Sequence, residues 1–222
     1  MRTVVKLDLK IDKDEALALL DEYSDFIEQH TGIKCEWYVE RHDFSVVPTT
    51  PDSDGDLKPT YAYRQALTKD VYDRYGDYGC DNIVMWVHED NFLFKGVWGV
   101  NWSNSHFKYS LQLCRWDKDN SANSFGTLYH EQMHSFDAVI KRELGIDIEP
   151  EFGGDWDSQV VHGKGKWDYV RYKENTVALM QIADRLKRAY AIRKDRHLKK
   201  IGLMKQIVAL LSTLVGLLAK RK

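Results

Sequence analysis

The chain has 222 residues, of which 43% are hydrophobic and 30% charged, with only 4 Pro and 14 Gly. This length suits one domain, alone or with an appendage, and the composition excludes a wholly disordered or fibrous chain. The net charge of −2 is unevenly distributed. Residues 185–222 contain 12 Lys and Arg and one acidic residue, which leaves 20 basic and 33 acidic residues in residues 1–184. An acidic body excludes a nucleic-acid reader, whereas the basic tail suits an anionic lipid or an acidic partner.

The first two thirds of the chain alternate between strand-like and helix-like patterns. Apolar residues alternate over the first eleven positions and then recur at helical spacing as far as Gly32, which predicts a strand followed by a helix. A polar stretch with Pro and Gly, residues 48–60, is expected to be a loop. The remaining elements expected before residue 145 are strands at 33–47, 82–88, 94–102 and 108–116 and helices at 61–75 and 121–144.

This order of elements predicts an α+β (α/β-like) fold. Helical crossovers come early and short links come late, which favours a mixed, mostly parallel sheet with an antiparallel edge strand and helices packed on it. Further along, we expect a long helix at about residues 170–197 and a final apolar helix at residues 201–219.

Two units are expected from this pattern. The first is a domain at residues 1–197, made of an N-terminal subdomain at 1–145 and a C-terminal helical subdomain at 146–197. The second is a basic, apolar helical tail at residues 198–222.

Cysteine usage and the N-terminus bear on the compartment. The three cysteines, Cys35, Cys80 and Cys114, form no CxxC pair, so a disulfide framework is not expected and a reduced compartment is favoured. The N-terminus has no apolar run typical of a secretory signal. We therefore expect a cytoplasmic protein, with peripheral membrane association through the tail as an option.

The helix expected at residues 121–144 contains the run HEQMH, residues 130–134, which has the form HExxH. His130 and His134 are one helical turn apart, so both imidazoles can reach one cation, and Zn²⁺ is a preferred partner of neutral imidazole. The carboxylate of Glu131 can face a water on that metal and act as general base and acid. The motif predicts a zinc-dependent hydrolase.

On this motif and on the order of elements before it, residues 3–144 resemble the zincin metallopeptidases. The metzincin continuation HExxHxxGxxH is absent, because Asp137 replaces its Gly and Ile140 its third His. The run HEQMHSFD is similar instead to the HExxHxxD of some gluzincins, including the lethal-factor-like peptidases. We interpret Asp137 as a group that orients a histidine ligand or anchors a neighbouring loop.

The resemblance also implies how substrate binds. In zincins an antiparallel edge strand frames the cleft, and a peptide or protein substrate pairs with it in extended form. The run FKGVWGVNW supplies the candidate edge, with Val97, Trp98, Gly99 and Val100 as substrate-binding residues.

HExxH supplies only two protein ligands, so a third is needed, and two candidates stay open, both beyond residue 145. Glu174 matches the gluzincin pattern, in which a Glu from a later helix completes the site. His162 has a ligand type that zinc favours, in an apolar setting next to a glycine. Asp155 and Asp157 are candidates of lower rank.

Zincins also use a Tyr near the third ligand to stabilise the oxyanion. Tyr169 and Tyr172 are the candidates, although the lethal-factor-like position, seven residues before Glu174, is Trp167.

The tail carries bulky apolar residues on most of its circumference. They satisfy a heptad pattern, and lysines flank them. We expect first a self-associating or domain-packing helix, second an interfacial helix on a membrane surface, and third a membrane span.

The function predicted is zinc-dependent peptide-bond hydrolysis by a metalloendopeptidase. The alternatives are a non-catalytic metal-binding protein and a membrane-associated or self-assembling protein with a zincin-like body.

Overall fold

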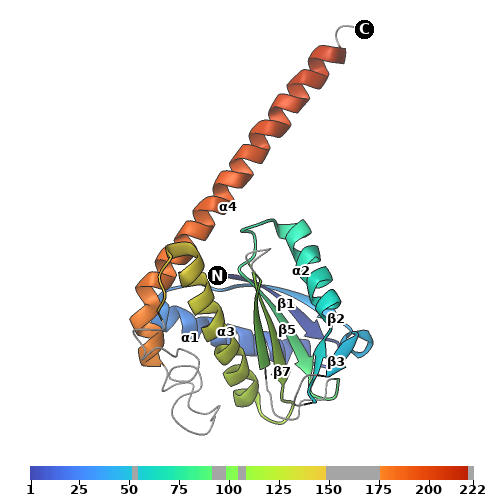
Figure 1. The fold of residues 1–222 in the computed structure, drawn as a ribbon, viewed down its shortest axis with the longest axis vertical. Coiled ribbons are helices and arrows are strands. Elements are labelled where there is room, and N and C mark those ends of the chain that lie inside the picture. The colour runs from blue at the N-terminus through green and yellow to red at the C-terminus, as the bar shows by residue number, and fades with distance from the viewer. Residues whose placement is uncertain (52–54, 92–98, 105–108, 149–175, 220–222) are drawn as a thin grey trace.

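The computed structural model describes residues 1–51, 55–91, 99–104, 109–148 and 176–219 (Figure 1). Its elements in chain order are β1 (Arg2–Asp8), α1 (Lys13–Thr31), β2 (Glu36–His42), the 3-10 turn η1 (Phe44–Val46), β3 (Thr49–Pro51), β4 (Leu57–Pro59), α2 (Tyr61–Tyr75), β5 (Asn82–His88), β6 (Gly99–Asn104), β7 (Tyr109–Trp116), α3 (Ser121–Leu144) and α4 (Thr176–Ala219).

Five of the strands form one mixed sheet in the order β2-β1-β5-β7-β6. The pairs β1–β2, β1–β5 and β5–β7 are parallel, and β6 runs antiparallel to β7 at the edge. The prediction of a mostly parallel α+β fold with an antiparallel edge strand is therefore confirmed.

Helices cover both faces of this sheet, which explains why its central strands are apolar throughout. Helices α1, α3 and α4 lie on one face and α2 on the other (Figure 1). All seven residues of β5 are buried, and its side chains divide between two clusters: Trp86 packs with α1, α3 and α4, and Met85 packs with α2. Parallel strands buried on both faces need such continuous apolar runs.

Local signals set the ends of the helices. The carboxylate of Asp12 accepts hydrogen bonds from the backbone N–H groups of Asp14 and Glu15, so Asp12 caps α1 as an N-cap aspartate does. Gly145 ends α3 with φ of +67°, a conformation that glycine adopts without steric cost. The predicted bounds of 61–75, 82–88 and 121–144 are confirmed.

Two other predicted elements need correction. The strand expected at residues 33–47 is shorter: β2 spans Glu36–His42, and η1 follows because Asp43 caps a turn there. The loop expected at residues 48–60 contains the short antiparallel pair β3–β4. Part of the strand expected at residues 94–102 lies outside the described residues, and β6 begins at Gly99.

The prediction of two separate helices after residue 170 is wrong. α4 is a single helix of 44 residues from Thr176 to Ala219. Residues 197–201 contain no Pro, Lys199 pairs with Asp195 one turn earlier at 2.7 Å, and Gly202 costs a helix only about 1 kcal/mol relative to Ala. Within the described residues, no helix is long and apolar enough to cross a membrane.

An ion cluster at Arg193 holds α4 against the rest of the fold. Arg193 is 1% exposed, and its Nε lies 2.7 Å from Asp81 Oδ1 while its Nη1 lies 3.1 Å from Glu143 Oε1. Its Nη2 donates to the carbonyl of Cys80 at 3.1 Å. One guanidinium thus joins α4 to the end of α3 and the start of β5.

We expect Arg193→Met to lower the free energy of unfolding by about 3–5 kcal/mol. The substitution takes the one fully buried cation away from the buried carboxylates of Asp81 and Glu143, which keep only the more exposed Arg2 and Arg196 as partners. Urea denaturation followed by circular dichroism measures the loss. Lys194→Met removes the same charge from an exposed neighbour and should change stability by less than about 0.5 kcal/mol. Equal losses in the two variants would contradict a structural role for the cluster.

Candidate metal centre

The HExxH run lies in the middle of α3, on the side of the helix that approaches β6 and β7. Burial fixes how this helix is rotated, because Phe125, Leu128, Phe136 and Ile140 are each at most 2% exposed in the core shared with α1 and α4. His130 and His134 are consequently held on one face, one turn apart, with both side chains only partly exposed.

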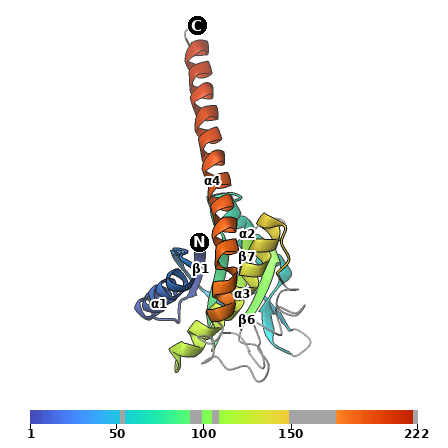
Figure 2. The same cartoon turned by 90° about the vertical axis from the view of Figure 1, so that its left-hand side faces the viewer.

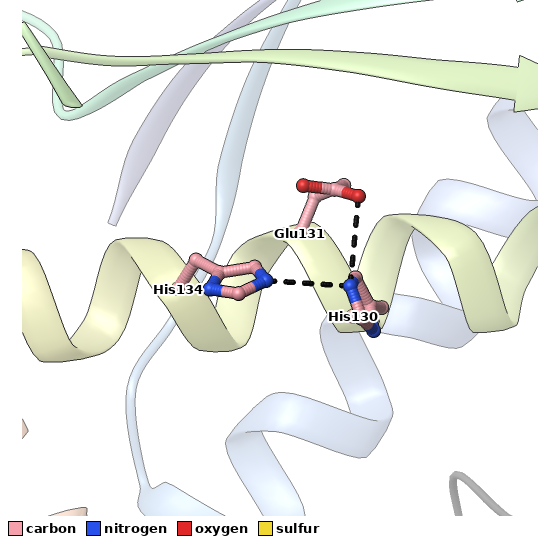
Figure 3. Close-up of side chains that lie close together, drawn as sticks. All are labelled: His130, Glu131 and His134. Atoms are coloured by element: carbon pink, nitrogen blue, oxygen red, sulfur yellow. Dashed lines mark hydrogen bonds and ion pairs between the residues drawn. The ribbon is translucent and has the colours of Figure 1, made fainter. Parts of the chain in front are cut away.

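The two imidazoles are turned toward each other (Figure 3). His130 Nε2 and His134 Nε2 lie 3.3 Å apart. Two nitrogen ligands of a tetrahedral zinc ion, each about 2.0–2.1 Å from the metal, are separated by about 3.3–3.4 Å. The distance and the chemistry of the two donors therefore fit a shared zinc ion.

Glu131 completes the only cluster of His and Glu side chains among the described residues that has metal-ligand spacing. The ligand atoms of His130, Glu131 and His134 all lie within 4.8 Å of one another. Glu131 is 2% exposed, and its Oε1 lies 3.8 Å from His130 Nε2. A carboxylate so deeply buried and so close to imidazole nitrogens is typical of a functional site.

The edge strand makes room for this carboxylate through Gly99. A Cβ atom added at Gly99 would lie 2.9 Å from both Cγ and Cδ of Glu131 and would overlap Oε1. Any other residue at position 99 would require either Glu131 or the start of β6 to shift.

A buried polar network fixes the motif helix to the sheet. Asn101 Nδ2 donates to the Glu131 carbonyl at 2.7 Å and to Ser135 Oγ at 2.8 Å. Gln112, the register partner of Asn101 on β7, donates to the same Ser135 Oγ at 2.7 Å. Sequence reasoning missed these residues. The one available signal was that Asn101 comes two positions after Gly99 and so shares its face of the strand.

Cys114 is fully buried on β7. Burial raises its pKa well above the usual range, and the negative charge of Glu131 raises the pKa further.

Asp137 is half-buried one turn after His134, and the two residues line a pocket of about 220 Å³ together with Asn101 and Ala138. This places Asp137 beside the site. Its role in orienting a histidine stays a prediction.

Of the other predicted site residues, only Gly99 and Val100 are described, both in β6. The remaining ones lie outside the described residues: Val97, Trp98, Asp155, Asp157, His162, Tyr169, Tyr172 and Glu174. The choice of third ligand and the tyrosine proposal stay predictions.

A second acidic group, Glu89, Asp117 and Asp119, has a structural explanation. Glu89 lies 2.5 Å from Arg115, which neutralises it. Asp117 accepts hydrogen bonds from the backbone N–H groups of Asp119 and Asn120 and so shapes the turn before α3.

No family model, no curated protein and no solved structure matches this chain.

We expect the protein to bind about one zinc ion per chain and His130→Ala or His134→Ala to abolish that binding, because each removes one of two preformed nitrogen ligands. Zinc titration with a competing chelator measures the dissociation constant. His30→Ala serves as control, since His30 lies on α1 and its Nδ1 is hydrogen-bonded to the Phe26 carbonyl. A wild-type protein without stoichiometric zinc binding would exclude the metal centre.

The same titration distinguishes the third-ligand candidates. Loss of a direct ligand should weaken binding by more than the roughly 10–100-fold typical of groups that only support a ligand. His162→Ala and Glu174→Ala are therefore compared side by side. If neither variant weakens binding, Asp137, Asp155 and Asp157 become the residues to test.

Proposed function

We propose that this protein is a zinc-dependent metalloendopeptidase of zincin type. The observation that carries the proposal is the 3.3 Å separation of His130 Nε2 and His134 Nε2, with the Glu131 carboxylate 3.8 Å from the first of them. The strand order of the sheet and its antiparallel edge support the same conclusion.

In this proposal His130 and His134 hold the zinc ion, and a third ligand, His162 or Glu174, completes its protein ligands. When bound, zinc supplies a Lewis acid that polarises the scissile carbonyl and favours deprotonation of water. Glu131 accepts the proton of the attacking water and returns it to the leaving nitrogen. Tyr169 or Tyr172 stabilises the negative charge that develops on the carbonyl oxygen.

The substrate backbone is proposed to pair with β6 in extended form. β6 is terminal in the five-stranded sheet, so one of its edges carries backbone groups that no described strand pairs. A peptide added along Gly99 and Val100 would pass directly over Glu131, because Gly99 is the residue that approaches that carboxylate.

We expect Glu131→Gln to keep zinc binding and the fold while lowering peptide hydrolysis by about a hundredfold or more. The amide has the shape of the carboxylate but cannot accept a proton from water. Cleavage of a peptide library by zinc-loaded protein, read by mass spectrometry, measures the loss. Glu15→Gln is the matched control variant, because it makes the same chemical change on the exposed first turn of α1. Near-wild-type hydrolysis in Glu131→Gln would assign the base to another residue.

We expect Gly99→Ala to reduce hydrolysis by about 10–100-fold while zinc affinity changes by less than about threefold. The added methyl displaces Glu131, and a shift of about 1 Å in a reacting group can cost a hundredfold in rate. Gly202→Ala adds the same methyl where nothing lies within 4 Å and should leave both quantities unchanged. Full activity in Gly99→Ala would show that Glu131 does not need its present position.

A further inference from the structure

The last part of α4, residues 198–219, extends beyond the body of the protein and is called the arm below. Both views show it leaving the layered body and ending far from the sheet (Figures 1 and 2). At 1.5 Å per residue the arm is about 33 Å long. The earlier part of the same helix is different, since Leu179, Ile182 and Leu186 are fully buried in the core.

The arm is apolar and exposed. Ten large apolar side chains between Leu198 and Val215 are 38–70% exposed. A continuous apolar surface of this size on a helix marks a site of interaction. No contact within the described part of the chain covers it.

The width of the apolar surface argues against a simple dimer. At 100° per residue, the large apolar residues from Ile201 to Leu218 occupy an arc of about 200°, and Lys205, Gln206, Ser212 and Thr213 lie on the remaining arc together with Leu198. A two-stranded coiled coil buries only the narrow stripe of its a and d positions. Pairing along Ile201, Met204, Val208 and Leu211 would leave Leu203, Ile207, Leu210 and Leu214 in water. A lipid interface covers the whole arc at once.

Charge distinguishes a lipid surface from a larger bundle of arms. Residues 196–222 carry seven Lys and Arg and no acidic residue. Three of them, Arg196, Lys199 and Lys200, pair with Glu143, Asp195 and Asp77 of the same chain, which leaves Lys205 and the basic residues at 220–222. A bundle of several copies would gather Lys205 and the basic residues at 220–222 of each copy with no carboxylate in residues 196–222 to neutralise them, whereas helical bundles use oppositely charged flanking residues. An anionic lipid surface supplies the missing negative charge. Because residues 1–184 carry 20 basic and 33 acidic residues, the same surface repels the body, and the arm's length separates the two.

We propose that the arm docks this protein on an anionic lipid surface. The apolar arc lies in the boundary between headgroups and acyl chains, and Lys205 faces the headgroups. The basic residues at 220–222 add attraction at the far end of the arm, so docking there keeps the acidic body away from the surface. This proposal does not depend on peptide hydrolysis.

The test is co-sedimentation of the full chain with vesicles of phosphatidylcholine, alone or mixed with phosphatidylserine. We expect binding to the anionic vesicles to be at least about tenfold tighter, and to fall as salt screens the attraction. Leu211→Glu should weaken binding by about tenfold or more, because it places a charge in the centre of the apolar arc. Ser212→Glu adds the same charge one residue later, on the polar arc, and should weaken it by less than about threefold.

Four results would overturn the proposal. The first is equal binding to neutral and anionic vesicles, and the second is equal loss in the Leu211→Glu and Ser212→Glu variants. The third is binding that persists at high salt and after alkaline extraction, which would indicate an inserted segment. The fourth is wild-type protein that sediments without lipid as a trimer or larger while Leu211→Glu is monomeric, which would make a second copy the occupant. Circular dichroism of both variants confirms that the helix is kept.

Discussion

The burial of α3 is the constraint on which the rest of the structure depends. This helix packs its apolar residues, Phe125 and Phe136 among them, against α1 and α4, and it contacts β6 and β7 beside that core. A helix clamped in this way cannot rotate without exposing several large side chains, each worth about 1.5–3 kcal/mol of burial. The direction in which His130, His134 and Glu131 point is therefore set by the packing of other residues of α3.

The edge strand β6 combines two tasks that usually belong to separate elements. Asn101 binds the motif helix through the Glu131 carbonyl and Ser135, and Gly99 leaves space for the Glu131 side chain. The same strand is terminal in the sheet and so offers its backbone to an extended ligand. A ligand pairing with β6 would therefore touch the strand that positions the acidic group, which links recognition and chemistry in the proposed peptidase.

Helix α4 divides into two parts with opposite physical character. Up to about Arg193 it belongs to the core, and the ion cluster with Asp81 and Glu143 ties it to elements 112 and 50 residues away in sequence. Beyond Leu198 it is exposed and apolar. Because α4 is one continuous and therefore stiff helix, the buried cluster that anchors its first part also sets the direction of the arm. The proposed docking of the arm would consequently orient the body and its candidate metal centre relative to the surface.

The sequence by itself determined the features that depend on neighbouring residues. Helix bounds at 61–75 and 121–144, the buried strand at 82–88 and the stop at Gly145 follow from local periodicity and capping, and the spacing of His130 and His134 follows from one turn of helix. Only the tertiary structure decided the rest. The closeness of Gly99 to Glu131, the Asn101–Ser135–Gln112 network and the burial of Arg193 each join residues at least 20 positions apart. The continuity of α4 was also missed, because a weak local break at Gly202 is outweighed by unbroken backbone hydrogen bonding and by packing that begins far upstream. The periodicity of apolar residues in the sequence indicates which face of a helix or strand is apolar. Contacts between elements distant in sequence decide against which other element that face packs.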